Sequence, residues 1–259
     1  MNHLDFAIGL AKQAGPIIKE NFALGMPKEM KADRTPLTAT DLAINQMVNE
    51  AVKKTFPDHG LISEEGGFYS GQEYCWVCDP VDGTIPFSHG VPICMFMLGL
   101  MYKGQSILGV VYDPFMDKLY RAEKDQGAYL NNGRIYVSKK TKVEETALNI
   151  FSWVGAKYQY PGLFDEVWQK DVFDMNLGCV GYADMMVACG EFTACVFPGE
   201  TTWDSVAPKI IVEEAGGKFT DLYGNDHNFL QPVQGHLATN GLVHDYFLDL
   251  IKKYLVVKQ

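Results

Sequence analysis

Short apolar runs alternate with glycine, proline and aspartate between residues 60 and 130, and this pattern constrains the fold more than any other feature. The runs cover 60–63, 73–79, 92–102, 106–112, 117–122 and 127–130. Their spacing of about ten residues is typical of strands joined by tight turns. The sequence therefore predicts a largely antiparallel sheet here, rather than alternating strand and helix units.

The segments on either side of these runs have a different pattern. Two amphipathic helices are expected first, over 3–24, where Pro16 could introduce a kink, and over 41–55, with Thr40 as the N-cap. From about residue 146, strands and helices alternate. Strands are expected near 147–153, 173–178, 192–197, 217–221 and 236–240, and helices near 162–169, 181–190, 203–215 and 242–255. We therefore expect an α/β (α+β) fold.

A charged stretch, KKTKVEET, marks a junction near 140–147 between these two patterns. We expect an N-terminal α+β part over 1–144 and a C-terminal α/β part over 145–259. The C-terminal part should carry Asp204 and the segment that faces the substrate.

The overall composition predicts an ordinary soluble protein of the cytoplasm. The 32 acidic residues against 22 Lys and Arg give a net charge of −10, which argues against nucleic acid or an anionic membrane as a partner. The first twenty residues lack the order of a signal peptide, and the apolar run 91–102 is too short to span a bilayer.

The six cysteines lie mostly inside apolar runs, which suits a reducing compartment. Cys75 and Cys78 form a CxxC, but on one strand they would face opposite sides and could not easily share a metal. The histidines, His236 among them, are scattered and show no ligand spacing.

Acidic residues gather where apolar runs end. Asp79 and Asp82 stand in CDPVDGT (78–84), Glu64 and Glu65 follow the run 60–63, and Asp204 heads an expected helix. The chain has no Lys or Arg between Lys54 and Lys103, and none between Lys170 and Lys209. Carboxylates that converge without basic partners repel one another, so a cation must be supplied from outside.

The residue types indicate which cation and which chemistry. Oxygen ligands without His or Cys favour Mg²⁺, with Mn²⁺ as a substitute. The proline-bounded turn can aim the Val81 carbonyl at the same point as Asp79. Gly83 and Thr84 follow at once, where backbone N–H groups can face an anion such as phosphate. Phosphomonoester hydrolysis needs up to ~10²¹-fold acceleration, and metal ions can supply most of it.

Four segments together resemble the inositol monophosphatase family, within the Mg²⁺-dependent, lithium-sensitive phosphomonoesterases that include fructose-1,6-bisphosphatase. The segments are LTATD (37–41), ISEEGG (62–67), WVCDPVDGTIPFSHGVP (76–92) and WDSVAPKIIVEEAGG (203–217). The resemblance spans nearly the whole chain in the right order. It implies a layered αβαβα sandwich, normally a homodimer, and a phosphoric monoester hydrolase of the inositol-phosphate type that uses two or three Mg²⁺ ions.

The resemblance also implies a set of site residues. The metal ligands would be Glu64, Asp79, the Val81 carbonyl, Asp82 and Asp204, with Glu65 near a weaker third ion. Glu64 and Thr84 would position the attacking water, and Asp41 would hydrogen-bond Thr84. The amides of Gly83 and Thr84 would hold the phosphate.

Departures from the family pattern concern the substrate. Phe197 stands where inositol phosphatases commonly place an acid that accepts hydrogen bonds from inositol hydroxyls, and a phenyl ring cannot accept them. The segment 176–181, with Gly178, Cys179 and Val180, should line the alcohol portion but is small and apolar. Pro86 and Pro208 also depart from the pattern, and Pro208 is expected to remove a backbone N–H from its helix and to bend it.

The substrate therefore stays open at this point. Inositol phosphate, histidinol phosphate, a sugar phosphate such as fructose 1,6-bisphosphate, and a 3′(2′),5′-bisphosphate nucleotide are the alternatives. A non-enzymatic alternative is a regulatory member that keeps the fold and binds a protein partner. His89, beside the phosphate motif, is interpreted as a structural loop residue rather than a general acid.

Overall fold

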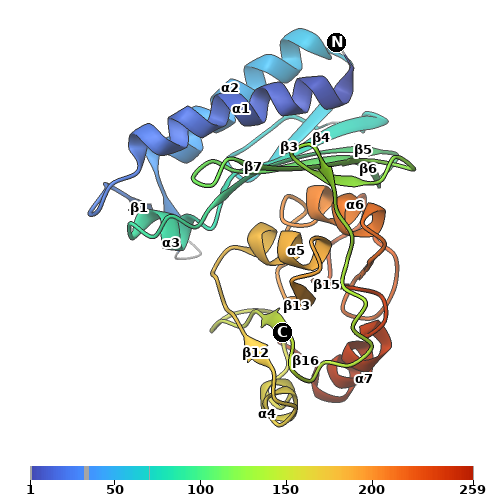
Figure 1. Cartoon of the computed structure of the whole chain (residues 1–259). Helices are drawn as coiled ribbons and strands as arrows, with labels where there is room; N and C mark the ends of the chain where they lie inside the picture. The colour runs from blue at the N-terminus through green and yellow to red at the C-terminus, as the bar shows by residue number, and fades with distance from the viewer. Residues whose placement is uncertain (1, 32–34, 70, 259) are drawn as a thin grey trace.

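Helices and sheets alternate in layers in the computed structural model, which describes residues 2–31, 35–69 and 71–258 (Figure 1). The helices are α1 (His3–Asn21), α2 (Ala39–Thr55), α3 (Thr84–Ser88), α4 (Leu163–Trp168), α5 (Val180–Ala188), α6 (Val206–Glu214) and α7 (His244–Tyr254). Helices α1 and α2 cover the outer face of a first sheet, α5 and α6 lie between two sheets, and α4 and α7 lie beyond the second sheet. This is the expected αβαβα sandwich.

The first sheet has the antiparallel character that the sequence predicts. Its seven strands among the described residues are, in spatial order, β3 (Gly60–Ser63), β4 (Tyr74–Asp82), β5 (Met95–Tyr102), β6 (Gln105–Asp113), β7 (Lys118–Glu123), β8 (Ala128–Leu130) and β9 (Gly133–Arg134). Only the β3–β4 pair in this sheet is parallel. Because β3 and β4 run in the same direction, their carboxyl ends, with Glu64 and Asp79, meet at one edge.

The second sheet is mixed. In spatial order it contains β12 (Phe173–Asp174), β10 (Ala147–Ile150), β13 (Phe192–Phe197), β15 (His236–Thr239) and β14 (Lys218–Thr220). Two short pairs complete the structure, β1 (Glu29–Met30) with β2 (Pro36–Leu37) and β11 (Tyr158–Gln159) with β16 (Val256–Val257). The first sheet uses residues before 144 and the second sheet residues after 145, and the division into two parts stays a prediction.

The helix starts differ from the expected ones in two places. Helix α2 begins at Ala39 with Thr38 as the N-cap, not Thr40, because the Asp41 carboxylate accepts the Thr38 N–H in a capping box.

Helix α6 begins at Val206, so Pro208 lies in its first turn. No intrahelical hydrogen bond needs an N–H at that position, so Pro208 does not cost the helix a backbone hydrogen bond. Helix α1 continues through Pro16.

The two buried clusters on either side of β4 show which way Cys75 and Cys78 face. Cys78 packs in the core under α1 and α2, whereas Cys75 packs in a cluster on the opposite face of β4. The two thiols therefore face opposite sides of the sheet, as expected. All six cysteines are free.

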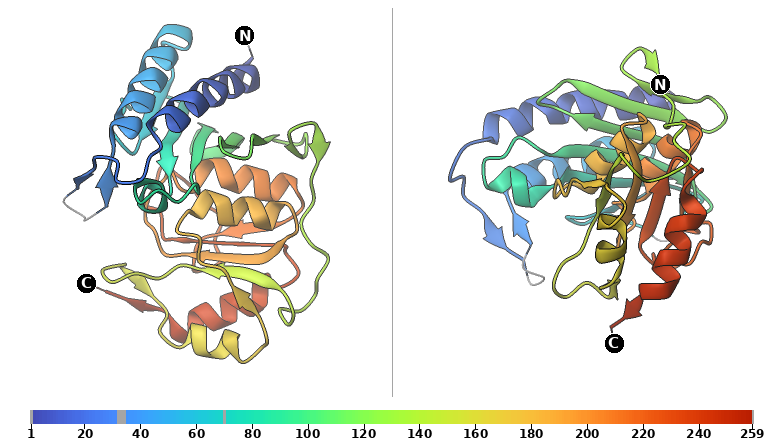
Figure 2. Two further views of the ribbon diagram at one scale, coloured as in Figure 1. Left: turned by 60° about the vertical axis from the view of Figure 1, so that its left-hand side comes forward. Right: turned by 60° about the horizontal axis from the view of Figure 1, so that its bottom comes forward.

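Two glycines allow α6 to lie directly on the first sheet. Gly99 of β5 and Gly109 of β6 are cross-strand partners. A Cβ atom on Gly109 would lie 2.4 Å from the Ala207 carbonyl oxygen, and one on Gly99 would lie 2.6 Å from Val206 Cγ1. Because Asp204 stands just before α6, this close contact sets how near Asp204 comes to the end of β4. Figure 2 shows α6 and α5 side by side between the two sheets.

No helix in the described part of the chain combines the length and apolarity that crossing a membrane requires.

The contact between α6 and the two glycines leads to a first prediction. Gly109→Ala should destabilise the protein by about 3 kcal/mol, because the added methyl group meets a backbone carbonyl rather than a flexible side chain. Urea unfolding monitored by circular dichroism measures this change. Gly133→Ala is the control, since a Cβ there would be 3.6 Å from its nearest neighbour. Equal effects of the two substitutions would contradict the account.

Candidate active site

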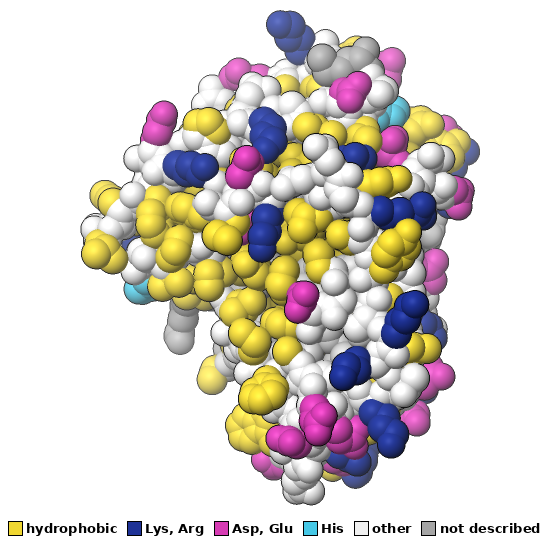
Figure 3. All heavy atoms as spheres, viewed as in Figure 1, with side chains coloured by type: hydrophobic (Ala, Val, Ile, Leu, Met, Phe, Trp, Pro, Cys, Tyr) yellow, Lys and Arg dark blue, Asp and Glu magenta, His cyan; other side chains and the backbone are white. Residues whose placement is uncertain are grey.

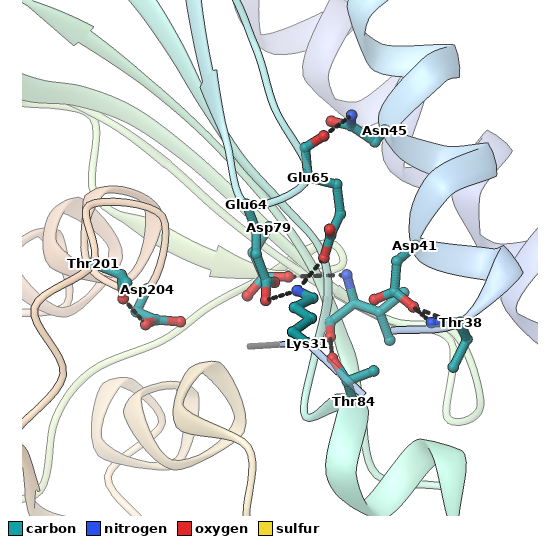
Figure 4. A network of polar contacts seen from close by, with 11 residues as sticks. Lys31, Thr38, Asp41, Asn45, Glu64, Glu65, Asp79, Thr84, Thr201 and Asp204 are labelled. Atoms are coloured by element: carbon teal, nitrogen blue, oxygen red, sulfur yellow. Dashed lines mark hydrogen bonds and ion pairs between the residues drawn. The ribbon is translucent and has the colours of Figure 1, made fainter. Parts of the chain in front are cut away.

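Three carboxylates meet where β4 ends and α6 begins. Oxygen atoms of Asp79, Asp82 and Asp204 all lie within 4.8 Å of one another, and Asp79 and Asp82 are buried. Glu64 follows β3 directly beside them, and its backbone N–H donates to the Cys78 carbonyl at 3.2 Å. Figure 4 shows Glu64, Asp79 and Asp204 at one place between the sheet and the helices. The structure therefore brings together acids that are distant in the sequence.

The end of β4 is irregular, and this irregularity orients Asp79. The pairing of β4 with β5 shifts register between Asp79 and Asp82. The Val81 N–H donates to Asp79 Oδ1 at 2.9 Å, so the Asp79 side chain is hydrogen-bonded to the turn that follows it. Thr84 Oγ1 donates to the Val81 carbonyl at 2.9 Å. The proline-bounded turn thus fixes the Asp79 carboxylate and the Val81 carbonyl together.

The amino end of α5 holds Asp82. Backbone N–H groups of Gly181 and Val180 donate to its two carboxylate oxygens at 2.6 and 3.2 Å, and the Cys179 thiol contacts Oδ2 at 3.0 Å. A Cβ atom on Gly181 would lie 2.9 Å from Oδ2, so only glycine allows this approach. Cys179 and Val180, which the sequence assigned to the alcohol portion, therefore contact a carboxylate of the acidic cluster. Gly178 is exposed, and a Cβ there would lie 3.5 Å from Pro86.

Burial and mutual repulsion make the acids reluctant to ionise. Burial, followed by the charges of Glu64, Asp82 and Asp204, raises the pKa of Asp79 well above its usual value. Burial and then Asp82 raise the pKa of Asp204 in the same way, although Thr201 donates a hydrogen bond to it. Burial raises the pKa of Asp82 to about 6, despite the three contacts from α5. Without a cation, the cluster retains protons that carboxylates normally release.

Gly83 is in the left-handed region, with φ of 83°. A Cβ there would be strained and would lie 2.9 Å from the Cys179 Cβ. Gly83 thus lets the chain turn from β4 into α3 while α5 approaches closely. This turn places the amides of Gly83 and Thr84 next to the acidic cluster.

Asp41 lies at the start of α2 and is fully buried. Its Oδ2 accepts hydrogen bonds from the Thr38 N–H at 2.8 Å and from the Thr38 hydroxyl at 2.5 Å, whereas Oδ1 has no hydrogen-bond partner among the described residues. The bond between Asp41 and Thr84 that the resemblance implies is not formed, because Thr84 donates to Val81 instead. Burial raises the pKa of Asp41 to about 6, and Glu64 and Glu65 add to this effect.

Lys31 is the residue that sequence reasoning missed. Its ammonium group donates to Glu64 Oε1 at 2.7 Å and also pairs with Glu65 (Figure 4). Partial burial lowers the pKa of Lys31, but the hydrogen bonds to Glu64 and Glu65 outweigh it, so the net pKa is raised. The expectation that no basic residue balances the acids is therefore wrong for Glu64 and Glu65. Lys31 follows β1 and lies 33 residues before Glu64, and no local pattern connects them.

The sequence also singled out Phe197 and His89. Phe197 is only 8% exposed and packs edge-on against Phe151, with ring centroids 5.3 Å apart. The rings of Trp153 and His236 also pack against Phe197, with centroids 5.7 and 5.1 Å away. His89 is exposed, and one ring nitrogen lies 2.8 Å from the Ile85 carbonyl. This contact agrees with a structural role for His89.

The donor set fits a hard divalent cation. The cluster offers only oxygen atoms, its carboxylates hold protons that a cation could replace, and one buried oxygen of Asp41 nearby lacks a partner. Lys31 neutralises Glu64 and Glu65 but contacts none of the three clustered aspartates. A cation bound by Asp79, Asp82 and Asp204 would supply the missing positive charge.

Comparison with known proteins shows the family to which the chain belongs. The family described as the inositol monophosphatase family matches residues 2–255. A fructose-1,6-bisphosphatase/inositol-1-monophosphatase of Thermotoga maritima is 31% identical over 98% of this chain and 97% of its own length. A histidinol-phosphatase of Mycobacterium tuberculosis is 31% identical over 96% and 98%. A solved structure described as Thermotoga maritima IMPase is 30% identical, superposes with a TM-score of 0.88, and covers 98% of both chains.

The raised pKa of Asp41 leads to a prediction about stability. The folded protein holds this proton up to pH about 6, whereas the unfolded chain releases it near 3.8, so burial of Asp41 lowers the free energy of unfolding as pH rises between these values. In chelator, Asp41→Asn should gain stability over the wild type by about 2 kcal/mol between pH 4 and pH 7.5. Urea unfolding at both pH values measures this gain.

Asp245→Asn is the matched control, because Asp245 is also in the first turn of a helix but is exposed. Because its ion pair with Lys218 is exposed, Asp245→Asn should change the free energy of unfolding at pH 7.5 far less than Asp41→Asn does. An Asp41→Asn effect that does not change with pH would contradict the account.

Proposed function

We propose, on the premise that this chain is a phosphatase of the inositol monophosphatase family, that it hydrolyses a small phosphomonoester in a Mg²⁺-dependent reaction. The observation that supports this most is the meeting of Asp79, Asp82 and Asp204 within 4.8 Å. Such a cluster of carboxylates, two of them buried, has no use in an ordinary core, where uncompensated charges cost several kcal/mol each.

We assign the ions to the acidic cluster and its neighbours. Asp79, Asp82, Asp204, Glu64 and the Val81 carbonyl would hold two Mg²⁺ ions, with Glu65 near a third, and Mn²⁺ could substitute. When bound, the ions would neutralise charge on the phosphate and lower the pKa of water. The α5 amides keep Asp82 in a fixed orientation, and the Asp79 turn does the same for its carboxylate.

The remaining residues would hold the reactants in line. Glu64 and Thr84 would orient the water that attacks phosphorus, since Thr84 is already fixed by the Val81 carbonyl. The Gly83 and Thr84 amides would donate to phosphate oxygens. One carboxylate oxygen of Asp41 has no partner in the described part of the chain, and it would accept a hydrogen bond from Thr84 when substrate is present. Positioning of this kind can supply about 7–11 kcal/mol of the barrier.

The substrate we favour is a small monoester whose alcohol portion is less polar than inositol. Phe197 replaces the acid that would accept hydroxyl hydrogen bonds, and its ring packs with the rings of Phe151, Trp153 and His236. Histidinol phosphate and sugar phosphates stay candidates, since relatives with both kinds of name match the chain over nearly its full length. A bisphosphate nucleotide is a further candidate.

The assembly, the compartment and the lithium sensitivity also remain proposals. Figure 3 shows hydrophobic side chains gathered across one face of the molecule, and such a face supports a homodimer. The acidic net charge and the free cysteines support a cytoplasmic protein without a nucleic-acid partner.

Removal of two acids tests the proposed activity. Asp79→Asn and Glu64→Gln should each lower kcat for p-nitrophenyl phosphate with Mg²⁺ by roughly 10³-fold, because each removes a charge that the ions require. Glu200→Gln should stay within about twofold of the wild type, since Glu200 is exposed and pairs with Lys157. Activity that survives both acid substitutions, or persists in chelator, would refute the proposal and favour the regulatory alternative.

A substrate comparison tests the role of Phe197. Inositol monophosphate should not be preferred over histidinol phosphate, fructose 1,6-bisphosphate or adenosine 3′,5′-bisphosphate by more than about tenfold in kcat/KM, because no acid accepts its hydroxyl groups. Phosphate release from each substrate at equal Mg²⁺ measures this. A larger preference for inositol monophosphate would show that other groups recognise the ring.

A further inference from the structure

A second cluster of possible metal ligands lies behind Asp204 and contains none of the residues assigned to Mg²⁺. It consists of Asp184 from α5, Cys195 from β13 and His236 from β15, all fully buried at 0% exposure. A carboxylate oxygen, a sulfur and a ring nitrogen of these residues lie within 4.8 Å of one another. No spacing pattern in the sequence connects these three positions.

The topology of the second sheet brings the three side chains together. In the antiparallel pair β13–β15, Phe197 lies opposite His236 and Cys195 lies opposite Ala238. Residues two apart on a strand share a face, so Cys195 and His236 are diagonal neighbours on one face of the sheet. Helix α5 packs on β13, and Asp184 on this helix lies over the diagonal pair.

Polar atoms in this cluster have no hydrogen-bond partner outside it among the described residues. Within that part of the chain, the carboxylate of Asp184 and Nε2 of His236 face only each other and the Cys195 thiol, with Nε2 3.2 Å from Asp184 Oδ2. An ionised carboxylate in a dry core costs several kcal/mol unless something compensates it. A cation between the carboxylate, the ring nitrogen and the sulfur would satisfy all of these atoms at once.

The other nitrogen of His236 is held as ligand histidines usually are. Nδ1 lies 3.0 Å from Ser205 Oγ, and Ser205 is fully buried. A histidine that binds a metal through one nitrogen almost always hydrogen-bonds through the other, which fixes the ring. If Nδ1 donates to Ser205, the lone pair of Nε2 faces Asp184 and Cys195. The hydrogen bond to Ser205 is an observation independent of the cluster.

We propose that Asp184, Cys195 and His236 bind one zinc-type transition-metal ion, Zn²⁺ or Co²⁺. Sulfur and imidazole nitrogen favour zinc over magnesium, and the three side chains would fill three of the four tetrahedral positions. One divalent ion with an aspartate, a thiolate and a neutral imidazole gives a net charge of zero, so the buried site is electrically balanced. Binding releases the thiol proton of Cys195 to solvent.

The ion would have a structural role that reaches the acidic cluster. It would join α5, β13 and β15, and through Ser205 it would fix the start of α6, directly after Asp204. Because the site is fully buried, the ion would be incorporated as the chain folds.

The proposal is tested with full-length protein expressed in medium that contains Co²⁺ and purified without chelator. Wild-type protein should retain one Co²⁺ per chain after dialysis against Mg²⁺ and show the near-ultraviolet charge-transfer absorption of a cobalt–thiolate bond. Cys195→Ser should abolish this absorption, and Asp184→Asn and His236→Gln should lower the retained Co²⁺ at least tenfold. Cys189→Ser and Asp79→Asn should change neither quantity.

Two results would overturn the proposal. One is wild-type protein, grown with Zn²⁺ or Co²⁺, that retains no such ion by mass spectrometry; the three side chains would then form a metal-free polar cluster. The other is retained Co²⁺ without thiolate absorption, which would place the ion elsewhere. Both results come from the wild type, so they hold even if a variant fails to fold. Neither depends on phosphatase activity, so the proposed function can fail or stand separately.

Discussion

Repulsion among buried carboxylates is the interaction on which the rest of the structure depends. Asp79, Asp82 and Asp204 share a volume a few ångströms across. Burial raises the pKa of each, and repulsion from the other acids raises the pKa of Asp79 and Asp204 further. The fold offsets this repulsion in part, with the α5 amides on Asp82 and with Lys31 on Glu64 and Glu65. What remains uncompensated is the charge that a divalent cation would neutralise. A site that is costly without ions is therefore built to bind them.

The layered architecture makes this arrangement possible because the helices between the sheets contact both of them. Helix α6 lies on Gly99 and Gly109 of the first sheet and so brings Asp204 to the end of β4. Helix α5 directs its first amides at Asp82 and packs its other residues on the second sheet. The acidic cluster thus depends on packing across the whole molecule, and substitutions far from it should alter metal affinity.

Much of the fold and of the acidic cluster could be predicted because the relevant signals are local. The apolar runs predicted the strands of the first sheet, and the motif from Asp79 to Thr84 predicted the turn at the end of β4. Lys31 could not be predicted, because a β-hairpin brings it to Glu64 across 33 residues without any pattern. The cluster around His236 was missed for the same reason, since its members meet only through strand pairing and helix packing. The N-cap was misplaced by two residues because Thr38 and Thr40 are equally suited by type, and only the Asp41 contact distinguishes them.

We propose that the three aspartates bind the divalent ions that catalysis requires. Anomalous diffraction from crystals soaked in Mn²⁺ tests this most directly, because Mn²⁺ takes the oxygen ligands of Mg²⁺ and scatters anomalously. We expect a strong peak at about 2.2 Å from carboxylate oxygens of Asp79, Asp82 and Asp204. A map in which Mn²⁺ binds other residues and leaves these carboxylates without a peak would contradict it.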